Sequence, residues 1–92
     1  MTCLLCDRHL VQLTVHHLIP RQTVKRKQAK SGATILICSA CHRQIHLLYT
    51  NLELARYLNT LEKLKSEPKM KKFLKWIAKQ DPQKKVRIYR KQ

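Results

Sequence analysis

Two Cys-x-x-Cys pairs, Cys3/Cys6 and Cys38/Cys41, constrain this chain more than any other feature of its sequence. A chain of 92 residues buries only a modest part of its surface, so a cross-link or a metal ion is expected to supplement its core. Zinc prefers four soft ligands in a tetrahedron, and each Cys-x-x-Cys turn can present two thiolates to one ion. The two pairs therefore predict one closed, structural zinc site that fixes the N-terminus to a later segment.

Disulfides are the alternative use of the four cysteines, in any of three pairings. No apolar signal segment precedes Cys3, and no run of residues approaches transmembrane length. We therefore expect a cytoplasmic protein, and a reducing compartment favours metal over disulfides. A redox-active dithiol is the other reading of either pair alone, but the presence of two pairs favours a metal site.

The charge of the chain predicts a polyanionic partner. Its formal net charge is +15, from 20 Lys and Arg against 5 Asp and Glu. Nucleic acid suits this excess, whereas neither a membrane nor a small-molecule substrate is expected. The few carboxylates are widely spaced, which disfavours a nuclease mechanism in which several of them clamp two Mg²⁺ ions.

The histidines suggest a second metal site, separate from the cysteines. His42 and His46 are four residues apart on a predicted helix, so both imidazoles project from one face. His16, at the end of a predicted strand, can supply a third ligand and leave positions open for water and a phosphate oxygen. His17 would then be the general base, because histidine can accept a proton from water near neutral pH. His9 is expected to be a surface residue.

Other roles for these histidines stay open at this stage. Neighbours on a regular strand face opposite sides, so pairing His16 and His17 in one site requires an irregular strand near Pro20. His42 and His46 could also complete a second structural zinc site or pack without chemistry. The chain would then be a non-catalytic zinc module that binds nucleic acid.

Periodicity places these residues on short elements. Apolar and polar residues alternate over residues 11–16, which predicts a half-buried strand ending near Pro20, and residues 33–37 predict a second strand. Helical spacing predicts helices over residues 40–49, 50–66 and 68–81, the second starting at a capping box of Thr50 and Glu53. We expect a single domain over residues 1–82, comprising a core (1–49) and a helical extension (50–82), and then a basic tail (83–92).

Residues 21–32 are polar and mostly basic, which predicts an exposed loop before the second strand. Basic side chains here and on the first helix are expected to position a nucleic-acid backbone without reading its sequence. The expected nucleic-acid-binding residues are Arg21, Lys25, Arg26, Lys27, Lys30 and Arg43.

Three blocks of the sequence resemble the HNH endonucleases and cover roughly the first half of the chain. They are Cys3-x-x-Cys6, then His16-His17-Leu18-Ile19-Pro20-Arg21, then Cys38-x-x-Cys41-His42 with His46. The resemblance implies a small α+β fold: a ββα-metal motif with a structural zinc. The helical spacing adds two C-terminal helices after it. The resemblance also implies that the first residue of the doublet is a metal ligand, that the second is the general base, and that His42 and His46 complete the metal site.

The family is named partly for an asparagine, whose position falls near Ala33 in this chain, with Thr34 beside it. The asparagine itself is missing here. Thr34 is therefore the candidate to orient His17. The function expected from the resemblance and the residues is metal-dependent hydrolysis of DNA phosphodiester bonds with weak sequence specificity. The catalytic cation is Mg²⁺, Mn²⁺, Ni²⁺ or Zn²⁺, all of which an imidazole-rich site accepts. The alternatives are the non-catalytic zinc module and an RNA-directed nuclease.

Overall fold

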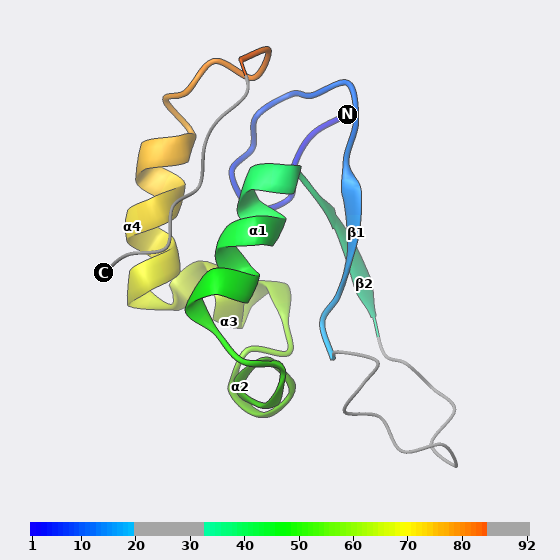
Figure 1. The fold of residues 1–92 in the computed structure, drawn as a ribbon, viewed down its shortest axis with the longest axis vertical. Coiled ribbons are helices and arrows are strands. Elements are labelled where there is room, and N and C mark those ends of the chain that lie inside the picture. Colours follow the sequence, from blue (N-terminus) through cyan, green and yellow to red (C-terminus); the bar gives the residue numbers. More distant parts are fainter. Residues whose placement is uncertain (20–32, 85–92) are drawn as a thin grey trace.

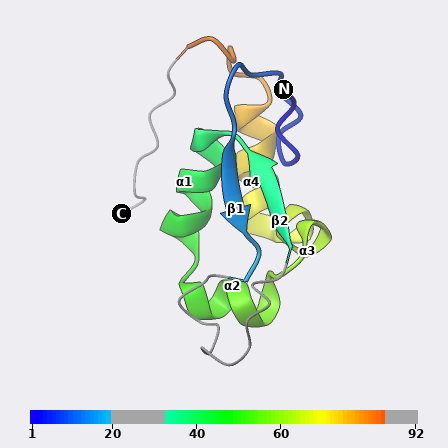
Figure 2. The same cartoon turned by 90° about the vertical axis from the view of Figure 1, so that its right-hand side faces the viewer.

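The computed structural model describes residues 1–19 and 33–84, and it confirms the predicted small α+β fold. Helix α1 lies between a two-stranded hairpin on one side and α4 on the other, with α2 and α3 at one end (Figure 1). Seen from the side of the hairpin, β1 and β2 lie in front and α4 lies behind them (Figure 2). The elements are β1 (Thr14–His17), β2 (Thr34–Ile37), α1 (Ser39–Leu48), α2 (Asn51–Tyr57), α3 (Leu61–Ser66) and α4 (Pro68–Ile77).

The hairpin is antiparallel, with a register that runs from Thr14 opposite Ile37 to His17 opposite Thr34. Because Ile35 and Ile37 face the core, their partners His16 and Thr14 face the same way. Val15, opposite Leu36, is on the outer face and is half exposed. The alternation correctly predicted a strand, but β1 is shorter than expected. Its buried face carries His16 rather than the valines.

Helix α1 begins where the second cysteine pair requires it. Cys38 is its N-cap, with a sulfur that accepts a hydrogen bond from the backbone N–H of Cys41. The helix covers Ser39–Leu48, one residue earlier at each end than predicted. Its residue Ile45 faces the core and is fully buried.

Residues 50–66 form two short helices instead of the single helix that was predicted, so three helices follow α1 rather than two. The capping box is confirmed, since Thr50 and Glu53 exchange both hydrogen bonds. After Tyr57, however, the Asn59 side chain donates to the carbonyl of Ala55, and the Thr60 hydroxyl caps α3 by accepting from the N–H of Lys63. Short polar side chains of this kind compete with the helical backbone bonds, which explains the break.

Helix α4 packs one apolar face against α1 and closes the core. Glu67 is its N-cap and Pro68 its first residue, as expected, and Met70, Phe73 and Ile77 are buried. It ends at Ile77, four residues before the predicted end. Buried residues form one cluster from the cysteines through Ile45 to these side chains.

Some expectations fall outside the described residues. These are the basic loop with Arg21, Lys25, Arg26, Lys27 and Lys30, and positions 85–92 of the predicted tail. Within the described parts of the chain, no helix has the length and apolar character needed to cross a membrane.

Candidate functional site

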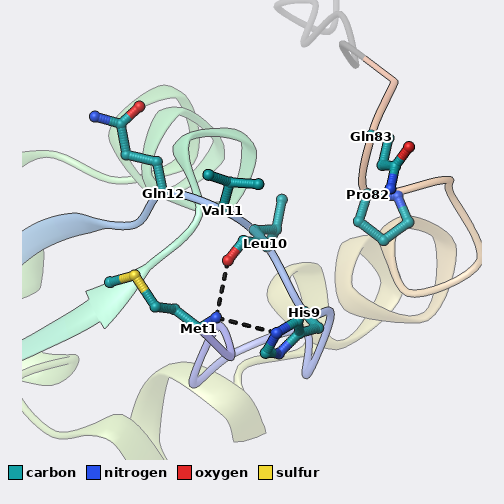
Figure 3. A pocket seen from close by; sticks show the side chains of 7 residues that line it. All are labelled: Met1, His9, Leu10, Val11, Gln12, Pro82 and Gln83. Carbon is teal, nitrogen blue, oxygen red and sulfur yellow. Dashed lines mark hydrogen bonds between the residues drawn. The ribbon is translucent and has the colours of Figure 1, made fainter.

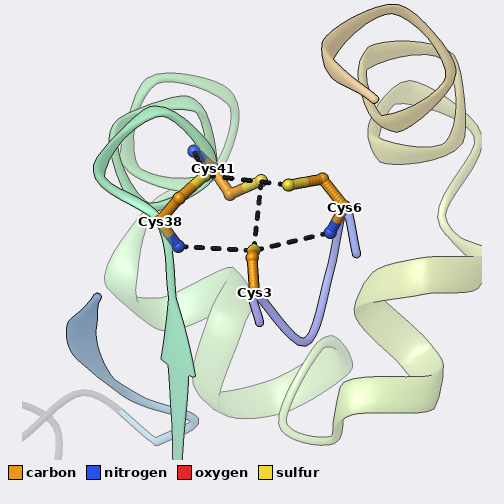
Figure 4. Close-up of side chains that lie close together, drawn as sticks. All are labelled: Cys3, Cys6, Cys38 and Cys41. Atoms are coloured by element: carbon orange, nitrogen blue, oxygen red, sulfur yellow. Dashed lines mark hydrogen bonds between the residues drawn. The ribbon is translucent and has the colours of Figure 1, made fainter. Parts of the chain in front are cut away.

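The four cysteines converge in a buried cluster that joins the N-terminal segment to the start of α1 (Figure 4). All four thiols are free, and their sulfur atoms lie within 4.8 Å of one another. The distances from Cys3 to Cys41 and from Cys6 to Cys38 are both 3.9 Å. A tetrahedral zinc with bonds of about 2.3 Å separates its sulfurs by about 3.8 Å, so these cysteines are positioned to hold such an ion.

The backbone shapes both turns around the sulfurs in the same way. In each pair the N–H of the second cysteine donates to the sulfur of the first: Cys6 to Cys3 at 3.5 Å and Cys41 to Cys38 at 3.4 Å. The N–H of Cys38 also donates to the Cys3 sulfur across the two turns, at 3.3 Å. Asp7 closes the first turn with a positive φ of 63°. Such bonds orient thiolates and offset part of their charge.

Arg8 also contacts this cluster, although nothing in the sequence singled it out. Its side chain is only 7 % exposed, and its guanidinium donates to the sulfurs of Cys6 and Cys38, each at 3.4 Å. Burial lowers the pKa of Arg8, but the bonds to Cys6 and Cys38 outweigh that effect and leave the pKa above its ordinary value. Hydrogen bonding with Cys3 is the main cause that lowers the pKa of Cys6 to about 6.

The three predicted histidine ligands also converge, on the side of α1 that faces the hairpin. His16 comes from β1, His42 and His46 come from α1, and the ring centroids are 5.1–5.6 Å apart. Their ligand nitrogens lie within 4.8 Å of one another. His16 is 1 % exposed, His42 is partly buried and His46 is exposed, so the cluster opens to solvent at the His46 side.

The hydrogen bonds of this cluster leave nitrogen lone pairs free. The Thr14 hydroxyl donates to the carbonyl of Ile37 at 3.0 Å and lies 2.9 Å from Nδ1 of His42. Since its one proton is already donated, it accepts from the N–H at Nδ1, which leaves Nε2 of His42 unprotonated. Nε2 of His16 is buried without a hydrogen-bond partner in the described structure. A buried polar atom of this kind needs a partner, and a metal ion can be that partner.

Burial keeps these imidazoles in the neutral form that binds metals. It lowers the pKa of His16 to about 4, and the charges of His42, His46 and His17 add to this effect. Burial also lowers the pKa values of His42 and His46. The cluster therefore presents neutral nitrogens near pH 7, as metal ligation requires.

His17 follows His16 in the regular part of β1, so the two side chains leave the strand on opposite faces. The strand irregularity that we expected does not occur within β1, because both histidines are paired in register, and Pro20 lies outside the described residues. His17 is partly buried, and its charge contributes to lowering the pKa values of His16 and His42, so it lies within electrostatic reach of the cluster. Thr34, which is exposed, lies directly opposite His17.

Other candidates lie nearby or elsewhere. Arg43 is exposed on α1, three residues before His46 and thus on a similar side of the helix. His9 is exposed, as expected, and its ring lies 3.3 Å from the amino group of Met1. That pair lines a surface pocket with Pro82 and Gln83 that contains none of the cysteines or clustered histidines (Figure 3).

Comparison with known proteins agrees with this geometry. The family described as HNH endonuclease matches residues 3–47, a range that includes both Cys-x-x-Cys pairs and the clustered histidines. A protein of Bacillus subtilis (strain 168), named Uncharacterized protein YisB, is 47 % identical over 85 residues, which are 92 % of this chain and 81 % of that protein. No solved structure matches the chain. On the family match and this similarity, the chain belongs to the HNH endonuclease family.

Proposed function

We propose that the chain is a metal-dependent endonuclease that hydrolyses DNA phosphodiester bonds. The observation that carries this proposal is the open histidine cluster: three neutral imidazoles from β1 and α1, with a buried, unpartnered Nε2 on His16 and a solvent-exposed side at His46. Three protein ligands with open positions beside them are typical of catalytic metal sites, whereas four closed ligands are typical of structural sites.

In this proposal His16, His42 and His46 hold one divalent cation. Such an ion supplies positive charge that polarises the scissile phosphate and stabilises the leaving oxygen. Thr14 keeps His42 in the tautomer that binds through Nε2. The exposed side at His46 leaves room for a phosphate oxygen and the attacking water.

His17 is the proposed general base. It lies at the last position of β1. Because a two-stranded ribbon twists strongly, side chains from opposite faces can approach one substrate at the end of the strand, and we therefore place the attacked phosphate there. There His17 can take a proton from water while His16, on the other face, binds the cation. Thr34, opposite His17 in register, is the proposed orienting residue in place of the family asparagine.

The cysteine cluster has a separate, structural role in this proposal. All four cysteines are buried and together fill a tetrahedral ion's coordination, so zinc bound there has no position for water. Zinc at this site would fix the N-terminus to α1, the helix that carries His42 and His46.

Charge supports nucleic acid as the substrate. The net charge of +15 attracts phosphate, and the proposed contacts are Arg43 and the basic residues of positions 21–30. Contacts of this kind give salt-sensitive binding with little dependence on base sequence, so we expect weak specificity.

A plasmid-nicking assay tests the proposal. The wild-type chain should nick supercoiled DNA with at least one of Mg²⁺, Mn²⁺, Ni²⁺ or Zn²⁺, and His42→Ala should abolish nicking, whereas the matched control His9→Ala should not change it. The metal content of the cysteine site is measured in parallel, so that its loss is not mistaken for loss of the catalytic ion. Equal nicking by His42→Ala, or faster cleavage of RNA than of DNA under all four ions, would contradict the proposal.

A further inference from the structure

Arg8 is a buried cationic side chain whose nearest polar partners are sulfurs. In a chain with a large excess of positive charge, an arginine would be expected to stay hydrated at the surface. Arg8 is instead only 7 % exposed. A buried charge needs compensation, and the described structure gives Arg8 two sulfur acceptors.

The two acceptors belong to different Cys-x-x-Cys turns. Nε of Arg8 donates to Cys6, two residues before it, and a terminal nitrogen donates to Cys38, which is 30 residues away in sequence. The planar guanidinium offers several N–H groups in a fixed fork, so one side chain can bridge two sulfurs. Arg8 thus joins the first turn to the start of α1 without using the metal ion.

The four sulfurs do not depend equally on Arg8. Cys3 accepts two backbone N–H bonds, from Cys6 and Cys38, and Cys38 accepts one from Cys41. Within the described residues, the Cys6 sulfur accepts an N–H hydrogen bond only from Arg8. The Cys41 sulfur accepts no N–H bond among the described residues, so loss of Arg8 would leave Cys6 equally without a donor. Cys6 is the more exposed of the two, at 5 % against 0 %, and is therefore the easier to release.

The positive charge of Arg8 also offsets negative charge in the cysteine cluster. Four thiolates around a divalent ion leave two excess negative charges in a buried cluster, and an adjacent guanidinium neutralises one of them. Hydrogen bonds to metal-bound sulfurs also orient them and reduce their tendency to leave the metal.

We propose that Arg8 is a positioning residue of the cysteine site: it retains the metal ion by holding the Cys6 and Cys38 sulfurs as metal-bound thiolates, and Cys6 is the first ligand to be released without it. This role is independent of the proposed nuclease activity, because it concerns the structural site alone. It differs from simple packing, since it requires the N–H donors and not only the aliphatic part of the side chain.

The experiment uses the full chain loaded with Co²⁺, whose absorption through bound thiolates reports the cysteine site and not the histidines. Arg8→Met keeps the apolar stem without the donors, Arg8→Lys keeps the charge with a single donor group, and Arg56→Met is the control at an exposed arginine. Loss of the thiolate absorption to excess chelator should be about 10-fold to 100-fold faster in Arg8→Met than in the wild type. Arg8→Lys should be intermediate, and Arg56→Met should be unchanged.

A second readout identifies the sulfur that is released. Brief treatment of the loaded protein with N-ethylmaleimide, followed by peptide mass analysis, should label Cys6 first in Arg8→Met and label Cys3 no faster than in the wild type. Wild-type rates of metal loss in Arg8→Met, or equal labelling of all four cysteines, would overturn the proposal. If Arg8→Met does not load with metal, Arg8→Lys decides: a wild-type rate of metal loss and an unchanged labelling order would overturn it.

Discussion

His16 illustrates at the scale of single residues what sequence can and cannot reveal about the site. Its type and its spacing from His42 and His46 suffice to predict that the three could bind one ion. Its burial, and the unpartnered Nε2 that results, depend on which face of β1 turns inward. That choice is made by pairing with Ile35 and Ile37, which no local pattern around His16 reveals.

Thr14 is a residue that sequence reasoning missed, and it leads to a specific prediction. Thr14→Val removes the acceptor for Nδ1–H of His42, so the ring can adopt the other tautomer, and metal affinity at the histidine cluster should fall about 10-fold to 100-fold. Calorimetric titration of Mn²⁺ or Ni²⁺ into protein whose cysteine site is already filled measures this affinity. Thr14→Ser, which keeps the hydroxyl, is the control. Equal affinity for the Val and Ser variants would mean that Thr14 does not set the tautomer.

His17 and Thr34 give a prediction that separates binding from catalysis. His17→Ala should keep the fold, metal binding and DNA binding, and lose about 10²-fold to 10⁴-fold in nicking rate, which is the usual contribution of a general base. Thr34→Ala should have a smaller effect on rate, because it removes only an orienting neighbour of His17. Single-turnover nicking at saturating metal measures both rates. An unchanged rate in His17→Ala would assign the proton transfer to another group.

At the scale of elements, local signals fixed where most helices begin, but they did not determine where a helix stops. The capping box of Thr50 and Glu53 and Pro68 at the start of α4 were both recognisable from sequence. The leucine spacing over residues 54–64 is compatible with one helix or with two that share a buried face. Asn59 and Thr60 decide between these through side-chain bonds that are worth only about 1 kcal/mol each, less than periodicity alone can resolve.

The break between α2 and α3 can be tested through its cap. Thr60→Ala removes the acceptor for the N–H of Lys63 and should lower the free energy of unfolding by about 1 kcal/mol, the usual value for an N-cap. Ser66→Ala, which removes a hydroxyl at the other end of α3, should cost less because it leaves no helical N–H without an acceptor. Urea denaturation followed by circular dichroism compares the two. If Thr60→Ala were the more stable variant, a continuous helix over 50–66 would be the preferred state.

At the scale of the whole molecule, the cysteine site and the helical extension stabilise the same core from opposite ends. Buried residues continue from Cys38 and Cys41 through Ile45 to Met70 and Ile77. The Tyr49 hydroxyl donates to the carboxylate of Glu67, which ties the end of α1 to the start of α4. The cysteine site and the start of α4 at Pro68 were both predictable from the sequence. That α4 packs against α1 could not be predicted, because apolar helix faces do not specify their partners.

This shared core predicts that residues 1–49 and 50–82 unfold together. Met70 is fully buried, so Met70→Ala should lower the free energy of unfolding by about 2–5 kcal/mol, whereas Lys71→Ala on the exposed side should have little effect. In Co²⁺-loaded protein, the thiolate absorption and the helical circular dichroism should be lost in one urea transition, shifted equally by Met70→Ala. A thiolate signal that persists after the helices unfold would show instead that the first 49 residues fold on their own around their metal. The helical extension would then be a separate unit, and the position of α1 beside the hairpin would depend on the cysteine site alone.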